Sequence, residues 1–161
     1  MRYKFTTLYV ALIVAVNYAF TVVPLVKLPD GTMWPPVALL VGLVFVARDF
    51  AQREGGHKVL LAMLVGVAIS YFMANPFVAT ASAAAFLISE LVDWAVYTYT
   101  KRPLSQRILF SSLLGAPVDS AVFLGLLSLL SPVGIAAMTA SKLVGAFIVW
   151  WMIRRREHAG A

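Results

Sequence analysis

Stretches of about 20 mostly apolar residues follow one another along this chain, separated only by short polar or proline-containing breaks. A helix needs about 20 such residues to cross the hydrocarbon core of a bilayer. Of the 161 residues, 61% are hydrophobic and 12% are charged, whereas soluble domains are about 45–50% apolar and about 25% charged. The chain lacks the polar surface of a water-soluble fold, so the sequence predicts an all-α, polytopic membrane protein.

The breaks divide the chain into six predicted spanning helices, which form a single transmembrane bundle over residues 1–161. The expected helices occupy residues 5–26, 33–50, 59–74, 76–100, 104–130 and 132–153. Prolines mark several ends, because proline is tolerated in a first helical turn but breaks a helix interior. Nothing between the helices is long enough to form a soluble domain.

Basic residues are distributed unequally between the two ends of these helices. Cytoplasmic loops of membrane proteins are enriched in Lys and Arg, so the distribution predicts that both termini are cytoplasmic. The same distribution explains the net charge of +6, so nucleic-acid binding is not needed to explain it. On the basic side lie Arg2, Lys4, Arg48, Arg53, Lys58, Lys101, Arg102, Arg107 and Arg154 to Arg156, while the opposite loops contain only Lys27.

Several kinds of chemistry are excluded by the residues that are missing. The chain has no cysteine, so it cannot form disulfides, thiolate metal sites or iron–sulfur clusters. His57 and His158 are isolated, which argues against a metal site, and no phosphate-binding loop follows Gly55 and Gly56. The sequence predicts no cofactor and no enzymatic activity, and any ATP-driven step would need a partner protein.

Charged residues nevertheless lie inside the predicted helices. Asp119 and Lys142 fall near the middle of their helices, and Glu90 lies slightly toward the cytoplasmic side. A charged side chain at the bilayer centre costs about 2.5–3.5 kcal/mol, so these groups must face one another or water. The same interior set includes Asp93 and Asp49, nearer the cytoplasmic face, and Asn17, near the middle of the first helix.

Helical spacing supports an inward-facing arrangement. Glu90, Asp93 and Tyr97 are spaced i, i+3, i+7 and share one face, as do Ser112 and Asp119 on the following helix, where Pro117 is expected to kink the helix. Lys142 could pair with Asp119 or Glu90 as a purely structural ion pair. Two carboxylates against one lysine would leave one acid for a proton or a ligand, so we expect an internal polar pocket.

The arrangement of these motifs resembles the queuosine-precursor transporter family, also called vitamin-uptake-transporter-like. The resemblance points to Asn17, Asp49, Asp93, Asp119 and Lys142, with Glu90 at a position where an amide or acid is expected. The chain departs from the family in its trimmed external loops. The motifs are VNYAF, FVARDFAQREGG, ATASAAAFLISELVDWAVY, SSLLGAPVDSAVF and SKLV, in that order along most of the chain.

The resemblance implies import of a 7-deazaguanine base across the prokaryotic cytoplasmic membrane. A carboxylate, Glu90 or Asp119, would accept the adjacent N1–H and amine of a guanine-type edge. Lys142 or Asn17 would donate to the carbonyl, and an aromatic ring would stack on the base. The expected substrate-binding residues are Glu90, Asp119, Lys142, Asn17, Asp93, Tyr97, Trp94 and Ser112, and Asp49 belongs to a motif on the cytoplasmic side.

The sequence is also compatible with other functions. The chain could be the substrate-binding subunit of an importer that needs a separate ATPase module. A stripe of Ala11, Ala15 and Ala19 would suit contact with such a module or with a second copy of the chain. An intramembrane enzyme using Glu90 and Asp93 is disfavoured, because no nucleophile or metal set accompanies these acids. The preferred base and the ion coupling do not follow from the sequence.

Overall fold

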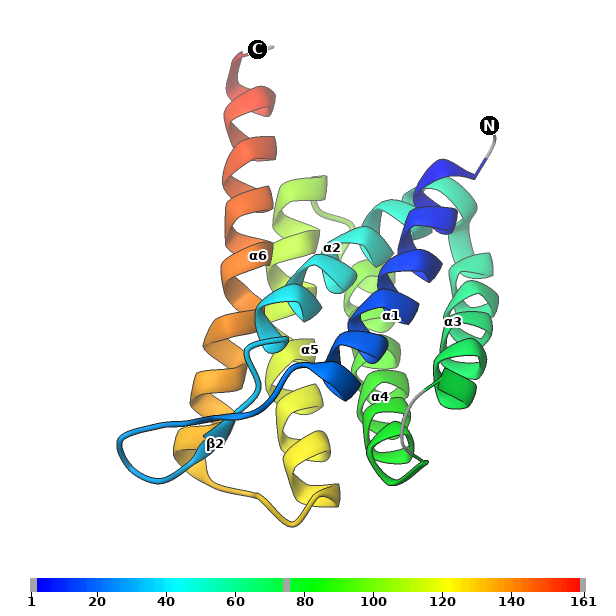
Figure 1. The fold of residues 1–161 in the computed structure, drawn as a ribbon. Helices are drawn as coiled ribbons and strands as arrows, with labels where there is room; N and C mark the ends of the chain where they lie inside the picture. The colour runs from blue at the N-terminus through cyan, green and yellow to red at the C-terminus, as the bar shows by residue number, and fades with distance from the viewer. Residues whose placement is uncertain (1–2, 74–75, 160–161) are drawn as a thin grey trace.

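The computed structural model describes residues 3–73 and 76–159, and these form a helical bundle with one small β-hairpin (Figure 1). The predicted all-α class is confirmed. The helices are α1 (Lys4–Val22), α2 (Ala38–Gly55), α3 (Val59–Met73), α4 (Pro76–Thr100), α5 (Leu104–Leu126) and α6 (Pro132–Ala159), with the 3₁₀ turn η1 (Gly56–Lys58) before α3. The hairpin pairs β1 (Val26–Lys27) antiparallel with β2 (Met33–Trp34).

Four stretches in the described residues are long and apolar enough to cross a membrane. They are Lys4–Val22, Ala38–Met73, Leu104–Leu126 and Pro132–Arg155, and the second contains both α2 and α3. Large apolar side chains such as Leu61, Phe72 and Phe147 are exposed on the outside of the bundle. This is the architecture of a multi-pass membrane protein, while the six separate spans and the orientation of the termini stay predictions.

The first two helices are shorter at the hairpin end than the sequence predicts. α1 ends at Val22 instead of residue 26, because Val23 is extended (ψ 121°) and Pro24 fixes the backbone that leads into the hairpin. α2 begins at Ala38 instead of residue 33, since residues 33–34 pair in β2. At its other end α2 continues to Gly55, and the left-handed Gly56 (φ +59°) ends it.

The ends of α5 and α6 also differ from the prediction. α5 runs without interruption through Pro117 but ends at Leu126 instead of residue 130, where Ser128 adopts a left-handed conformation (φ 57°). α6 begins at Pro132, and Ser131 Oγ accepts a hydrogen bond from the Gly134 N–H (2.9 Å), which caps the helix. The helix then extends six residues beyond the predicted end at 153.

Helix α2 occupies the centre of the bundle. It lies between α1 and α6 (Figure 1) and also contacts α4 and α5. Eleven of its 18 residues are buried, which is more than a helix at the lipid-facing surface of the bundle would bury. Glycines permit the close approach to α6: a Cβ at Gly42 would lie 3.0 Å from the backbone carbonyl carbon of Lys142. The second half of α2 is thereby placed deep inside the protein.

The chain connections group at two ends of the bundle. The start of α1, the turn η1, the α4–α5 loop and the end of α6 lie at one end, and the hairpin lies at the other (Figure 1). The hairpin is fastened to α6, because Trp34 Nε1 donates to Ser141 Oγ (3.0 Å). Lys27 is at the hairpin end, opposite the end that carries the basic loops.

Candidate functional site

Four charged side chains from α2 and α4 meet inside the bundle, and we call them the arginine cluster: Arg48, Asp49, Glu90 and Asp93. None is more than 1% exposed. The guanidinium of Arg48 lies 2.8 Å from Asp49 Oδ1, 3.4 Å from Glu90 Oε2 and 2.8 Å from Asp93 Oδ2. Buried charges are tolerated only when paired, so this one arginine holds acids from two helices in place.

Neighbouring helices supply hydrogen bonds to the acids of the cluster. Tyr9 of α1, which is fully buried, donates its O–H to Glu90 Oε2 at 2.7 Å. Ser111 of α5 donates to Asp49 Oδ2 at 3.1 Å. The arginine cluster therefore joins α1, α2, α4 and α5 through polar contacts.

A glycine makes room for one of these acids. The carboxylate of Asp93 lies directly against Gly115 of α5, where a Cβ would overlap Asp93 Oδ1 and lie 2.7 Å from Cγ. Any larger residue at position 115 would push α4 and α5 apart or displace the carboxylate. Gly115 is thus required by the packing of a buried charge.

The burial of Arg48 corrects the sequence prediction. We counted Arg48 with the basic residues of the cytoplasmic side, as part of the positive charge that orients the chain; the structure instead buries its side chain among three carboxylates. Arg48 is also a buried cation that the sequence prediction left out when it weighed two buried carboxylates against Lys142 alone. Glu90 and Asp93 are accordingly accommodated by Arg48, rather than by a cavity that they line.

A second buried ion pair joins α5 to α6. Lys142, which is 0% exposed, forms an ion pair with Asp119 Oδ2 and donates to Ser120 Oγ at 2.9 Å. Ser89 of α4 approaches Asp119 Oδ1 at 3.3 Å. Of the two partners that the sequence allowed for Lys142, the structure selects Asp119.

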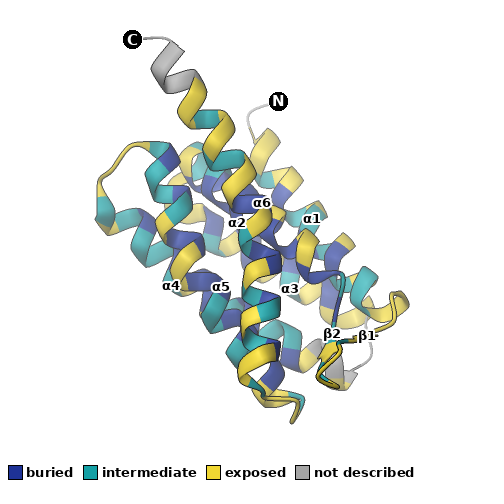
Figure 2. Cartoon of the chain, turned by 90° about the vertical axis from the view of Figure 1, so that its left-hand side faces the viewer, coloured by how far each residue is buried: buried dark blue, intermediate teal, exposed yellow. Residues whose placement is uncertain are grey.

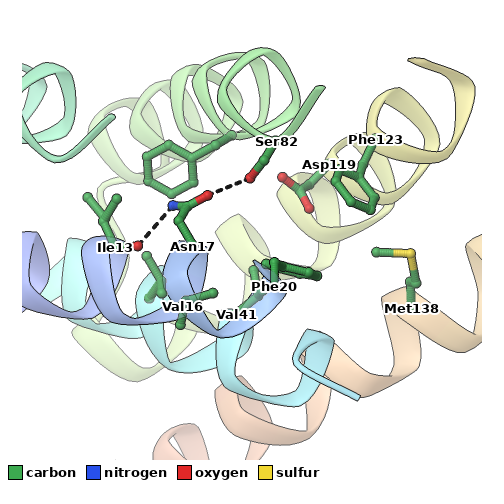
Figure 3. A pocket seen from close by; sticks show the side chains of 11 residues that line it. Ile13, Val16, Asn17, Phe20, Val41, Ser82, Asp119, Phe123 and Met138 are labelled. Carbon is green, nitrogen blue, oxygen red and sulfur yellow. Dashed lines mark hydrogen bonds between the residues drawn. The ribbon is translucent and has the colours of Figure 1, made fainter. Parts of the chain in front are cut away.

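One face of Asp119 borders a small internal cavity of about 30 Å³, which we call the bundle cavity. Three of its lining residues are polar, Asn17, Ser82 and Asp119, and the carboxylate of Asp119 is directed into it (Figure 3). The rest of the lining is apolar and comprises Ile13, Val16, Phe20, Val41, Val44, Phe86, Phe123 and Met138. A lining that is apolar with a few placed polar groups is typical of small-molecule sites, but such sites have volumes of about 300–1,000 Å³, so a base would fit here only after the helices move apart.

The amide of Asn17 is held in a fixed orientation at the cavity wall. Its Nδ2 donates to the Ile13 carbonyl oxygen (2.9 Å), and its Oδ1 accepts from Ser82 Oγ (2.7 Å), as the dashed lines in Figure 3 show. Since an amide nitrogen carries two hydrogens, one N–H of Asn17 is not used by the bond to Ile13. The wall therefore offers a donor from Asn17 and an acceptor from Asp119.

The remaining expected site residues lie away from the cavity lining. Lys142 contacts Asp119 from α6 without lining the cavity. The Tyr97 ring lies 5.9 Å from the guanidinium carbon of Arg48, which places it beside the arginine cluster. Trp94 Nε1 donates to His57 Nδ1 (3.1 Å) next to the turn η1. Ser112 is buried on α5, and its Oγ has no hydrogen-bond partner within the described part of the chain.

Sequence reasoning missed Arg48, Tyr9, Ser82 and the phenylalanine lining. Arg48 carried a usable signal, because it directly precedes an acid inside the apolar FVARDF segment. Ser82 lies in the small-residue run ATASAAA, where one hydroxyl does not stand out. The phenylalanines are indistinguishable from ordinary lipid-facing or core residues until the helices are packed.

A metal site is not indicated by the geometry of the acids. Within residues 3–73 and 76–159, no three His, Asp or Glu side chains are arranged to hold a metal ion. The carboxylates of the arginine cluster instead each face a guanidinium nitrogen. The absence of a cofactor stays a prediction.

Comparison with known proteins gives one match. Residues 5–155 match the model of a family described as "Putative vitamin uptake transporter". No curated protein and no solved structure matches the chain. The match covers α1 through most of α6, and so includes both the arginine cluster and the bundle cavity.

Proposed function

This chain belongs to the vitamin uptake transporter family, and on that premise we propose that it imports a 7-deazaguanine precursor of queuosine across the prokaryotic cytoplasmic membrane. The substrate would be the nitrile precursor, the aminomethyl precursor or queuine. Family membership supports uptake of a small organic molecule by a multi-pass membrane protein. The narrower substrate class is supported by the motif resemblance and by the chemistry of the bundle cavity.

The observation that carries the proposal is the carboxylate of Asp119 at the wall of a phenylalanine-lined cavity. A guanine-type edge presents an N1–H beside an exocyclic amine, and a carboxylate accepts both in a charge-assisted pair. Phe20, Phe86 and Phe123 offer apolar faces to a flat ring. A base with an adenine-type edge would leave the carboxylate unpaired and would be rejected.

The other polar residues take supporting roles in this proposal. The available N–H of Asn17 would donate to the carbonyl oxygen of the base, next to Ser82. Lys142 balances the charge of Asp119 from behind. Glu90, Asp93 and Asp49 would act through the arginine cluster, by fixing α2 and α4 around the cavity, rather than by touching the base.

The proposed topology has six spanning helices with both termini in the cytoplasm. Positively charged loops favour the cytoplasmic side. The turn η1, the α4–α5 loop and the end of α6, which carry Lys58, Lys101, Arg102 and Arg154, lie at one end of the bundle together with the start of α1 (Figure 1). This grouping supports the proposed orientation.

A rescue assay tests the function. A bacterium that can neither make nor import queuosine precursors expresses this chain, receives each base at low concentration, and is scored for queuosine in tRNA by boronate-gel shift. Rescue by the native chain is expected. Failure with every base, despite normal membrane expression, would contradict the proposed substrate class.

The role of Asp119 needs a variant that keeps the charges balanced. Asp119→Asn alone leaves Lys142 buried without its partner, whereas Asp119→Asn with Lys142→Met removes both charges. We expect this double variant to reach the membrane but not to rescue. Asp30→Asn, on the exposed hairpin loop, is the matched control and should rescue normally. Normal rescue by the double variant would remove Asp119 from the site.

A second candidate is the substrate-binding subunit of an importer with a separate ATPase module. It is favoured by α1, where Ala11 and Ala15 are exposed and only Ala19 packs against the core. Such a face would suit close helix contact with a module or with a second copy of this chain. Uptake of a labelled base into proteoliposomes that contain this chain alone would exclude the requirement for a module.

A further inference from the structure

The end of α6 carries arginines that lie against tryptophan rings. The guanidinium carbon of Arg154 is 5.1 Å from the ring centre of Trp150, and that of Arg155 is 3.7 Å from the ring centre of Trp151. Tryptophan is enriched at membrane–water interfaces. These pairs therefore place two positive charges at the level where lipid headgroups lie.

The start of α5 faces this end of α6 and repeats the same combination. Arg102, in the loop before α5, lies 5.3 Å from the ring centre of Phe110. A hollow between the two helices is lined by Arg102, Phe110, Trp150 and Arg154 among others, and a second hollow, lined by Trp150, Trp151, Arg154 and Arg155, shares two of these residues. We call the combined feature the α5–α6 groove.

The charged side chains that line the α5–α6 groove in the described part of the chain are all positive. Three arginines line it, and none of the described residues that line it is acidic. Arg102 donates to the neutral Gln106 (Nη1 to Oε1, 3.2 Å), so this contact does not neutralise it. Guanidinium groups bind phosphate oxygens in pairs of parallel hydrogen bonds, which makes a phosphate group the complementary ligand.

The groove continues into exposed apolar surface on both helices. On α5, Leu113 and Leu114 are 42% and 53% exposed, and on α6, Phe147 and Ile148 are 54% and 52% exposed. Figure 2 shows exposed residues of α6 in yellow on the part of the helix that stands clear of the bundle. A soluble phosphate ester would use only the basic end, whereas a phospholipid would use both surfaces.

We propose that the α5–α6 groove is a binding site for one anionic phospholipid, held by its phosphate between the arginines with its acyl chains along the apolar faces of α5 and α6. Anionic lipids attract basic groups at the cytoplasmic surface, with about 1 kcal/mol for each Lys or Arg. The site is separate from the bundle cavity. Its occupation does not depend on which base the protein transports.

Tryptophan quenching tests the site in the purified full-length protein. In a Trp34→Phe, Trp94→Phe background, which leaves Trp150 and Trp151 as the fluorescent tryptophans, brominated phosphatidylglycerol and brominated phosphatidylcholine are titrated in mixed micelles, and tryptophan quenching reports binding. We expect phosphatidylglycerol to bind more tightly, and Arg102→Gln with Arg154→Gln to weaken it about fivefold per arginine removed. The control with the same loss of charge at this end of the bundle is Lys4→Gln with Lys58→Gln, outside the groove.

Each outcome decides the proposal. Equal apparent affinities for the two lipids, or an equal loss in the control variant, would overturn it, because binding would then reflect general charge. A soluble arm with glycerol phosphate and inorganic phosphate competes against the brominated lipid. Competition at concentrations near that of the lipid would identify a soluble phosphate as the ligand and would refute the lipid site. Size-exclusion profiles matching the native protein verify that the variants are folded.

Discussion

Replacing Arg48 with methionine removes the cation that three buried carboxylates share, while keeping most of the apolar bulk of the side chain. Two of the carboxylates lie 2.8 Å from the guanidinium, and all are at most 1% exposed. None can turn to water without opening the contact between α2 and α4. We therefore expect Arg48→Met to destabilise the whole bundle.

The magnitude follows from the cost of a buried, unpaired charge. Breaking one buried ion pair by removing a partner costs about 3–5 kcal/mol, and Arg48 serves more than one partner, so this range is a lower bound. Total stabilities of single domains are about 5–15 kcal/mol. In a chain of this length about 1 kcal/mol corresponds to about 2–4 °C in Tm, which gives an expected loss of at least about 6–20 °C.

Thermal unfolding in detergent, followed by scanning fluorimetry, measures this loss. Arg53→Met is the matched control, because Arg53 is an exposed arginine on the same helix, and its Tm should match that of the native protein. Adding Glu90→Gln and Asp93→Asn to Arg48→Met should recover part of the loss, since fewer negative charges remain unpaired. A Tm for Arg48→Met within about 2 °C of the control would refute the argument that the acids depend on this arginine.

Three further substitutions test the contacts of the arginine cluster and of the Asp119–Lys142 ion pair, all by the same unfolding assay. Gly115→Ala should destabilise the protein by about 1–3 kcal/mol through overpacking. Gly125→Ala is the control and should not destabilise it, because the nearest neighbour of the new Cβ would be 3.9 Å away. Equal Tm values for the two variants would contradict the tight contact between Gly115 and Asp93. Tyr9→Phe should cost about 1–3 kcal/mol, because a buried acceptor loses its donor, and an unchanged Tm would show that this bond contributes little. Lys142→Met should destabilise the protein by about 3–5 kcal/mol, and adding Asp119→Asn should restore most of the lost stability. A coupling energy below about 0.5 kcal/mol between the two positions in the double-mutant cycle would contradict the ion pair.

Some of the site was readable from the sequence, and the reason is the cost of charge in lipid. Asp119 and Lys142 lie deep within apolar helices, so they had to face inward, and few partners were available to each. Asn17 was identified by its position near the middle of the first helix. For Glu90 and Asp93, the burial was predicted correctly, whereas their contact with Arg48 was not predicted.

The helix ends, too, were predicted from the sequence only in part. Pro24 and the segment after it marked the end of α1, but the sequence did not reveal that Val26 and Trp34 would pair in a hairpin. That pairing depends on two strands of two residues each, which are too short to produce an alternating pattern. It shortens both α1 and α2 relative to the prediction.

The sequence by itself therefore determined the class of protein, the approximate helices and the fact that its interior charges must be buried. These follow from composition and spacing within single helices. Only the tertiary structure decided that Arg48 points inward and that Asp119 faces a cavity shared with Asn17 and Ser82. The physical reason is that the rotation and depth of α2 are set by its close packing against α1 and α6. The pattern within one helix does not determine which side chain of a neighbouring helix will neutralise a buried charge.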